Sequence, residues 1–330
     1  MLWRDDVAQD QGAYKVLLKR GEITDAARVN DDGTPRTVPF KVYYPAGADA
    51  DQRRFPVILW SHGYGGSRDG AGFLARYVAS FGYILVHLTH TGTDSSLWEG
   101  KPGHPWEILK KAHVSRTTTL NRYRDIPFVL DALPDWFAQN PDLGAIVDWS
   151  AIGMSGHSFG AITTQVAAGQ LTPDEDGALI SLYDPRITSG ITYSPVPGTS
   201  HLSGGADGEN QGANIYATIK TPLLHMTGTE DSSPVNNMPY TERFKVYDLT
   251  EEADVKALLI KEGGDHMVYN GTRGALAANP MRDRHEDIIK HVSLAWWDAW
   301  LKGDALAQAW LKDEVVALYL GADAKWKAAG

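Results

Sequence analysis

The clearest chemical signal in the sequence is Gly156-His-Ser-Phe-Gly160, which matches the pattern G-x-S-x-G. The segment follows a short apolar run and precedes a helical stretch rich in small residues. A serine at such a junction occupies a sharp turn that lifts its hydroxyl clear of the sheet, and glycines two residues to either side leave room for the turn. A helix N-terminus at the hydroxyl also favours developing negative charge. We therefore predict that Ser158 is a nucleophile and that His157 packs beneath the turn rather than acting as a base.

A second glycine-rich segment, His62-Gly-Tyr-Gly-Gly66, follows the apolar run at residues 57–60. When a serine attacks a carbonyl group, the carbonyl oxygen becomes an anion, and backbone N–H groups already in place stabilise it. Loss of one such donor typically costs about 3 kcal/mol. One donor is expected from Phe159, directly after the nucleophile, and the other from the loop after an early strand. The sequence thus predicts an oxyanion hole formed by Tyr64 and Phe159.

A serine hydroxyl needs a base to take its proton, and in this type of site the base follows the serine and a carboxylate in the chain. His266 lies in Lys261-Glu-Gly-Gly-Asp-His-Met267, a loop directly after an apolar run, and we predict that it is the base. His201, in a Gly/Ser-rich segment, is the reserve candidate. The remaining downstream histidines are expected in the sheet or on the C-terminal helix: His225, His285 and His291.

The acid of the triad is expected in Met226-Thr-Gly-Thr-Glu-Asp-Ser232, which follows a strand and precedes the predicted base. This segment offers two carboxylates, and only one should orient the imidazole and stabilise its charged form. We predict Asp231, with Glu230 as the alternative. Asp265 is less suited, because the side chains of adjacent residues do not normally face each other.

The elements that would position these residues alternate between strands and helices. The runs expected as strands are 38–44, 55–60, 83–88, 151–154, 187–193, 222–226 and 255–261. The stretches with helical spacing are 72–81, 121–139, 161–168, 286–301 and 305–311. This alternation predicts an α/β fold, with a mostly parallel sheet and helices on both faces.

Residues 1–37 are polar and are expected to be an N-terminal extension, with a short strand at 14–18. The remainder, 38–330, is expected to form a single catalytic domain. Two insertions near 91–119 and 194–214 interrupt the alternation, and loops of this length are usually lids or binding loops.

The first insertion carries Trp98 and Trp106, which either form a wall over a pocket or pack within the insertion. Arg116, Arg122 and Arg124 follow as a small basic cluster, which we expect to be a solvated or salt-bridged face, with contact to an anionic substrate as the alternative. His285 and His291 are six residues apart, whereas two ligands on one helical face need a separation of three or four. No metal site is therefore expected there.

Composition narrows the function classes further. The chain has 330 residues, of which 43% are hydrophobic, and a formal charge of −10, which argues against non-specific nucleic-acid binding. It contains no cysteine, so disulfides and thiolate sites are excluded. No apolar run approaches the roughly 18 residues of a membrane span. Residues 1–6 lack the pattern of a signal peptide, so we expect a cytoplasmic protein, or a secreted one if a leader precedes this start.

These motifs together resemble the dienelactone-hydrolase-like branch of the α/β-hydrolases, which includes platelet-activating-factor acetylhydrolase-like esterases and bacterial cutinase-like polyesterases. Four segments in order carry the resemblance: His62-Gly-Tyr-Gly-Gly66, Gly156-His-Ser-Phe-Gly160, Thr227-Gly-Thr-Glu-Asp231 and Gly263-Gly-Asp-His266. Asn121-Arg-Tyr-Arg-Asp125 and Trp300-Leu-Lys-Gly-Asp304 add to it, and it covers about residues 38–312.

The resemblance implies an α/β-hydrolase fold, no cofactor, and an acyl-serine intermediate that water resolves. The chain departs from dienelactone hydrolases by carrying serine instead of a cysteine nucleophile. It departs from many cutinases by its lack of a cysteine pair and by the 91–119 insertion.

We expect a serine esterase that acts on carboxylic esters with short or medium acyl chains, or on aryl or polymeric esters. A lipase or phospholipid acetylhydrolase with the same triad is the alternative. A non-catalytic binding protein that keeps the fold is a third hypothesis.

Overall fold

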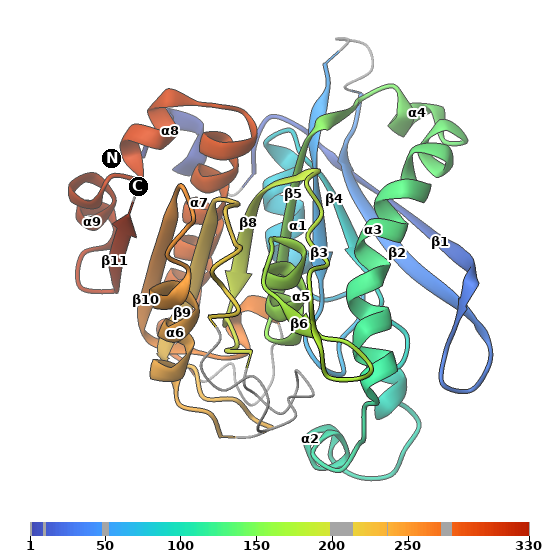
Figure 1. Cartoon of the computed structure of the whole chain (residues 1–330). Coiled ribbons are helices and arrows are strands. Elements are labelled where there is room, and N and C mark those ends of the chain that lie inside the picture. The colour runs from blue at the N-terminus through green and yellow to red at the C-terminus, as the bar shows by residue number, and fades with distance from the viewer. Residues whose placement is uncertain are drawn as a thin grey trace.

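A computed structural model describes residues 2–8, 11–47, 53–198, 214–235, 237–271 and 279–329 (Figure 1). Within these ranges, nine strands form one mixed sheet in the order β1-β2-β4-β3-β5-β8-β9-β10-β11, and helices lie on both of its faces. The prediction of an α/β fold with a mostly parallel sheet is therefore confirmed.

The centre of the sheet consists of parallel strands buried on both faces. They are β4 (Ile84–Leu88), β3 (Phe55–Ser61), β5 (Val147–His157), β8 (Ile187–Tyr193), β9 (Leu223–Glu230) and β10 (Lys256–Asp265). Antiparallel strands close the edges: β1 (Val16–Val29) and β2 (Pro35–Pro45) on one side and β11 (Ala324–Ala329) on the other. A separate hairpin pairs β6 (Thr172–Pro173) with β7 (Leu179–Ile180). Burial on both faces explains why the central strands are nearly continuous apolar runs.

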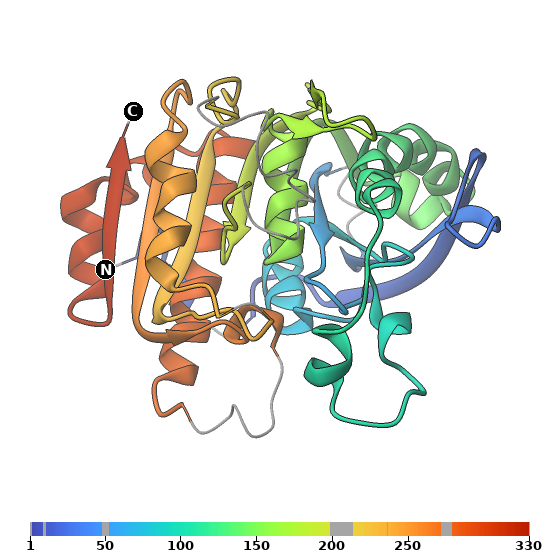
Figure 2. The ribbon, with the colours of Figure 1, turned by 60° about the horizontal axis from the view of Figure 1, so that its bottom comes forward.

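Two layers of helices cover the sheet (Figure 2). One layer contains α1 (Gly72–Ser80) and α7 (Arg282–Leu301), and α8 (Ala305–Trp310) packs against α7. The other contains α3 (Arg116–Ala138), α5 (Phe159–Ala167) and α6 (Phe244–Leu249). The remaining α-helices are α2 (Pro105–Leu109), α4 (Pro141–Gly144) and α9 (Asp313–Leu320). None of the described helices is long and apolar enough to cross a membrane.

Strand β3 shows how the two layers are held. Val57 and Leu59 belong to the core beneath α3, whereas Ile58 and Trp60 belong to the core beneath α1 and α7. Successive side chains of a strand point to opposite faces, so one apolar strand supplies both cores. All four side chains are at most 1% exposed.

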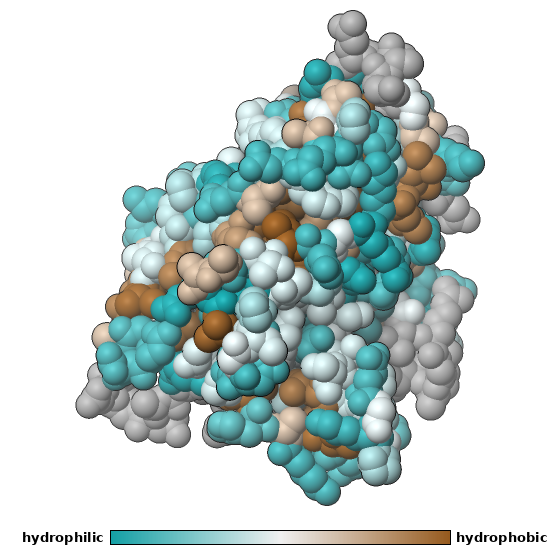
Figure 3. Space-filling view, turned by 90° about the vertical axis from the view of Figure 1, so that its right-hand side faces the viewer, coloured by the Kyte–Doolittle hydropathy of each residue, from teal (hydrophilic) through white to brown (hydrophobic). Residues whose placement is uncertain are grey.

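The N-terminal segment departs from the prediction. Instead of a short strand at 14–18, β1 runs from Val16 to Val29 and pairs with β2 in continuous register from Val16↔Pro45 to Asp25↔Arg36. It is an edge strand, and it leaves Leu17, Leu18 and Val29 exposed. The face on that side of the molecule is mostly hydrophilic, with hydrophobic residues in small separate areas (Figure 3). A strand with so much exposed surface can be polar, and its sequence then lacks an apolar run.

The parallel arrangement determines where the candidate residues lie. Parallel strands share one edge for their carboxyl ends, and ligand sites in α/β sheets form outside that edge. Strands β3, β5, β9 and β10 end there, directly before the loops that carry Tyr64, Ser158, Asp231 and His266. Helix α2 lies beyond the same edge, at the bottom of Figure 1.

Candidate active site

Ser158 occupies a strained turn between β5 and α5. Its backbone has φ 57° and ψ −114°, in a region that residues other than glycine rarely adopt. Strain of this kind costs about 1–3 kcal/mol, persists only where the surroundings impose it, and clusters at functional sites. The backbone N–H of Ser158 donates to the carbonyl of Tyr193 at 2.9 Å, which ties the turn to the end of β8.

The two glycines of the motif are required by close backbone contacts. A Cβ atom on Gly156 would lie 2.2 Å from the carbonyl oxygen of Gly160. A Cβ atom on Gly160 would lie 1.9 Å from the carbonyl oxygen of Ser61, at the end of β3. Both contacts are with backbone, which cannot move aside as a flexible side chain can. The spacing of the motif therefore follows from the packing of the turn against β3 and α5.

Ser158 and His266 open into one cavity of about 280 Å³. Its lining combines the predicted nucleophile and base with the glycine-rich loop and part of the first insertion. The lining residues are Gly63, Tyr64, Gly65, Gly66, Trp98, His104, Pro105, Trp106, Leu109, His157, Ser158, Ser233, Pro234, Val235, His266, Met267 and Asn270. Most of this lining is apolar, which suits a substrate with little charge near the reacting bond.

His266 is bound to Asp231 through a short hydrogen bond. Nδ1 of His266 lies 2.6 Å from Oδ1 of Asp231, and since the carboxylate can only accept, Nδ1–H donates and leaves Nε2 as the acceptor. Glu230 is exposed at the end of β9. Asp265 accepts instead from the backbone N–H groups of Met267 and Val268. The structure thus brings Asp231, and neither Glu230 nor Asp265, to the predicted base.

Three further side chains hold the carboxylate of Asp231. Ser194 Oγ and Thr227 Oγ1 donate to Oδ2 at 2.7 and 2.8 Å. Arg243, at the end of the short 3-10 helix Tyr240–Arg243, places Nη2 3.1 Å from Oδ1 and 3.2 Å from His266 Nδ1. Sequence reasoning assigned no role to any of the three: Thr227 lies within the predicted acid segment, whereas Ser194 and Arg243 come from segments without a recognisable motif.

These contacts set the charges of the pair. Burial alone would raise the pKa of Asp231, but Arg243 and His266 outweigh it, so the pKa is lowered and the carboxylate stays ionised. Burial lowers the pKa of His266 below its ordinary value of 6.5, and the charge of Asp231 offsets this only in part. At neutral pH the imidazole is therefore uncharged and able to accept a proton at Nε2.

This charge state predicts the acid limb of the pH profile. As pH falls through the pKa of His266, which lies below 6.5, the imidazole binds a proton and cannot act as a base. We expect kcat/KM to be level near pH 8 and to fall about tenfold per pH unit on the acid side of that pKa. Steady-state kinetics with circular dichroism at each pH checks this, and a limb centred above pH 7 would contradict it.

His157 packs against His266, consistent with its predicted place under the turn. Its Nε2–H donates to the carbonyl of His266 at 2.8 Å, and the two ring centres are 4.6 Å apart. Burial lowers the pKa of His157 well below the usual value, so the ring stays neutral.

The residues predicted to supply the oxyanion donors are Phe159, which directly follows Ser158, and Tyr64, which lines the same cavity. Phe159 is the first residue of α5, so its N–H has no partner within the helix. A Cβ atom on Gly63 would lie 3.5 Å from Cβ of Ser158, which places the segment leading to Tyr64 directly against the turn. The ring of His62 fixes this segment, since Nδ1–H donates to the carbonyl of Gly63 at 2.6 Å and Nε2 accepts the N–H of His90 at 3.0 Å.

The first insertion forms one wall of the cavity. Trp98 and Trp106 both line it, and Trp98 Nε1 donates to the carbonyl of Gly65 at 2.7 Å. The hydroxyl of Tyr64 reaches the carbonyls of Leu109 and Ala112 at 3.5 and 3.4 Å. The insertion therefore packs on the glycine-rich loop and narrows access to Ser158. Of the second insertion, only residues 194–198 and 214 belong to the described ranges.

His225, His285 and His291 are not among the residues that line the cavity. His225 is buried in β9 with Nδ1 2.7 Å from Thr192 Oγ1. On α7, His285 Nε2 bonds the carbonyl of Glu262, and His291 Nδ1 bonds the hydroxyl of Tyr319. His201 lies outside the described residues. Within the described ranges, no group of three or more His, Asp or Glu side chains is placed to hold a metal ion.

The predicted basic cluster is divided by the structure. Arg124 pairs with Glu175 at 2.8 Å, and Arg116 donates to the carbonyl of Pro173, as expected of a surface. The expectation is wrong for Arg122, which is fully buried. Arg122 lies in the stretch 118–123 of α3, where every residue is buried, so this part of the helix leaves no side open to solvent.

Comparison with the models of known protein families gave no match for the chain, and a search of curated proteins found none either.

Proposed function

We propose that the chain is a serine hydrolase with an α/β-hydrolase fold, and that it cleaves carboxylic esters. One observation carries the proposal: Ser158, in a strained strand-to-helix turn, shares a cavity with His266, which is hydrogen-bonded to a buried, ionised Asp231. The chain order Ser158, Asp231, His266 is that of α/β-hydrolases.

The reaction follows from the roles of these groups. Ser158 Oγ attacks the ester carbonyl while His266 Nε2 takes its proton, and Asp231 stabilises the imidazolium that forms. The backbone N–H groups of Tyr64 and Phe159 bind the oxyanion. His266 then gives its proton to the departing alcohol, which leaves an acyl-serine. A water molecule, activated by His266, releases the acid and regenerates Ser158. No step needs a cofactor.

The cavity favours small esters over long-chain lipids. Its volume of about 280 Å³ is at the lower end of the usual range for ligand sites, and the aromatic side chains of Trp98 and Trp106 form part of its wall. Short acyl groups and aryl groups suit these dimensions. A lipase or phospholipid acetylhydrolase would have to accommodate a long acyl chain beside the same serine.

The test is hydrolysis of p-nitrophenyl esters from acetate to palmitate. We expect kcat/KM to fall by about tenfold or more between butyrate and palmitate, because the longer chain does not fit the cavity. Covalent labelling by a fluorophosphonate, located by mass spectrometry, is expected on Ser158. Rates that rise with chain length would favour the lipase alternative. The absence of both hydrolysis and labelling in folded protein would favour a binding protein.

A further inference from the structure

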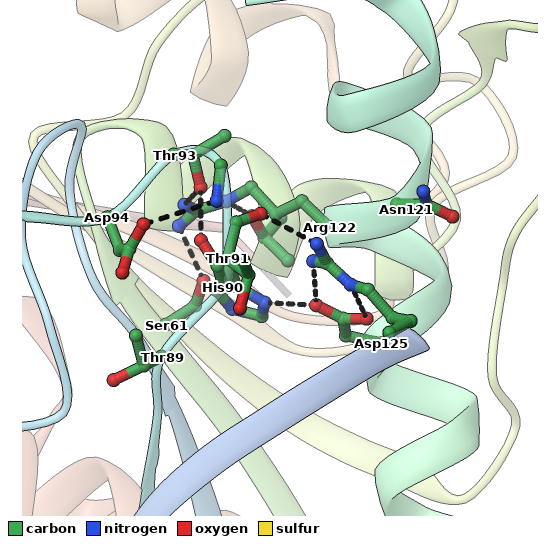
Figure 4. Close-up of polar contacts among 12 residues, drawn as sticks. Ser61, Thr89, His90, Thr91, Thr93, Asp94, Asn121, Arg122 and Asp125 are labelled. Atoms are coloured by element: carbon green, nitrogen blue, oxygen red, sulfur yellow. Dashed lines mark hydrogen bonds and ion pairs between the residues drawn. The ribbon is translucent and has the colours of Figure 1, made fainter. Parts of the chain in front are cut away.

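Arg122 lies among polar side chains that include Ser61, Thr93 and Asp125, and it makes an unusual set of contacts (Figure 4). It is carried by α3 and has no solvent exposure. Nε donates to Thr163 Oγ1, Nη1 to Thr93 Oγ1, and Nη2 to Ser61 Oγ, each at 2.8 Å. Nη2 also donates to the carbonyl of His62. All of these acceptors are neutral oxygens.

The contacts of Arg122 join the two halves of the hole. The carbonyl of His62 immediately precedes the Gly63–Tyr64 segment, so the hydrogen bond fixes the start of the loop that supplies one donor. On the other side, the guanidinium carbon lies 4.4 Å from the ring centre of Phe159, whose N–H is the second donor. Thr163 extends this contact, because its hydroxyl also donates to the carbonyl of Phe159 at 3.1 Å.

The charge of Arg122 has no carboxylate in contact with it among the described residues. The buried carboxylate of Asp125, on the same helix, is bound instead by Arg36 at 2.5 and 3.0 Å, by Arg28 at 3.1 Å and by His90 Nδ1 at 2.9 Å. Burial lowers the pKa of Arg122 to about 9, so the group remains charged at neutral pH. A buried charge is normally paired, since its desolvation is costly, and an unpaired cation here favours an anion forming nearby.

We propose that Arg122 is a positioning residue for the oxyanion hole, which holds the Tyr64 loop and the first turn of α5 at the spacing that the tetrahedral intermediate needs. The inference rests on the proposed function. It extends that function to a residue outside the cavity, which acts through the backbone of His62 and the ring of Phe159. Its fixed charge adds a field that stabilises the oxyanion more than the neutral ester.

The test compares Arg122→Lys with Arg36→Lys. Both arginines are buried and belong to the same group of hydrogen-bonded polar side chains. Arg36, however, contacts Asp125 and the carbonyl of Thr91 rather than the Tyr64 loop or α5. Lysine keeps the charge and loses the planar fork that reaches four acceptors. For Arg122→Lys we expect kcat to fall about 10- to 100-fold, with KM changed less than threefold. This loss in kcat is smaller than the loss expected when an oxyanion-hole donor is removed altogether. For Arg36→Lys we expect a lower melting temperature with kcat within threefold of wild type.

A boronic acid that forms a tetrahedral adduct on the serine provides the second readout. Its affinity should fall by a factor similar to that in kcat for Arg122→Lys and should be retained in Arg36→Lys. If Arg122→Lys does not fold, Thr163→Val removes one acceptor of Arg122 and its link to Phe159, and should lower kcat about threefold to tenfold. Unchanged kcat in a folded Arg122→Lys or in Thr163→Val would overturn the inference, as would equal losses in Arg122→Lys and Arg36→Lys.

The wild-type protein separates this inference from the proposed function. If it hydrolyses esters and is labelled at Ser158, the proposed function stands and the variants alone decide the role of Arg122. If it does neither, the proposed function fails and the role of Arg122 in an oxyanion hole fails with it.

Discussion

Replacement of Ser158 by alanine is expected to lower kcat on p-nitrophenyl esters by about 10⁶-fold, to the residual rate that substrate binding and the oxyanion hole support without a nucleophile. The hydroxyl oxygen of Ser158 is the only protein atom that the proposed mechanism joins covalently to the substrate, so without it no acyl-enzyme can form. Folding should be unaffected, because alanine fits the same turn with the same number of backbone contacts. Steady-state kinetics with purified protein measures the loss.

Ser155→Ala is the matched control. Ser155 lies on the same strand, is 3% exposed, and donates only weakly to the carbonyl of Leu59 at 3.4 Å. Its removal should leave kcat within about twofold. If Ser158→Ala retained more than a hundredth of the wild-type kcat, the nucleophile would have to be another group.

Replacement of Asp231 by asparagine is expected to lower kcat by about 10⁴-fold. Both carboxylate oxygens accept hydrogen bonds, one from His266 Nδ1–H and the other from the hydroxyls of Ser194 and Thr227. An amide can keep only one of these acceptors. If its NH₂ group faces His266, the proton moves to Nε2 and the imidazole cannot accept from Ser158. The charge of Arg243 would also lose its partner.

The control for Asp231→Asn is Glu230→Gln, a change of the same kind one residue earlier. Glu230 is exposed at the end of β9, whereas Asp231 is buried against His266, so kcat should stay within about twofold of wild type. Asp231 also pairs with Arg243, so Asp231→Asn can lower stability, and its thermal unfolding is measured in parallel. The value of kcat is then calculated from the concentration of folded protein. A larger loss in Glu230→Gln than in Asp231→Asn would assign the acid to Glu230.

The candidate triad was predictable because its signals are local. Each of the three residues directly follows an apolar run, and in a parallel sheet such runs end at one edge. Backbone atoms approach Gly156 and Gly160 closely, so the steric requirement of the turn is visible in the sequence of the motif itself. Asp231 was predicted over Glu230, but the contact that distinguishes the two carboxylates depends on which side chain is buried at the end of β9, and that is visible only in the structure.

The parts that were missed depend on contacts between distant segments. Arg122 reaches His62 and Ser61 across about 60 residues of sequence, and Arg243 reaches Ser194 across 49. An arginine in a polar stretch carries no sign of such partners, so its burial could not be inferred. Strand β1 was underestimated for a similar reason, because its order comes from pairing with β2 and not from an apolar run of its own.

Five buried histidines make the folding stability of the chain depend on pH. His62, His87, His90, His157 and His225 are each at most 3% exposed, and burial lowers the pKa of every one, to about 4 for His90 and about 3 for His87 and His225. Unfolding releases these rings to water, where their pKa returns to about 6.5. Below pH 6.5 the unfolded chain binds protons that the folded chain does not bind. The contribution of these histidines to the free energy of unfolding is therefore fully present above pH 6.5 and is lost as the pH falls toward their folded-state pKa values. The burial that keeps these rings uncharged in the folded protein therefore makes acidification favour the unfolded chain.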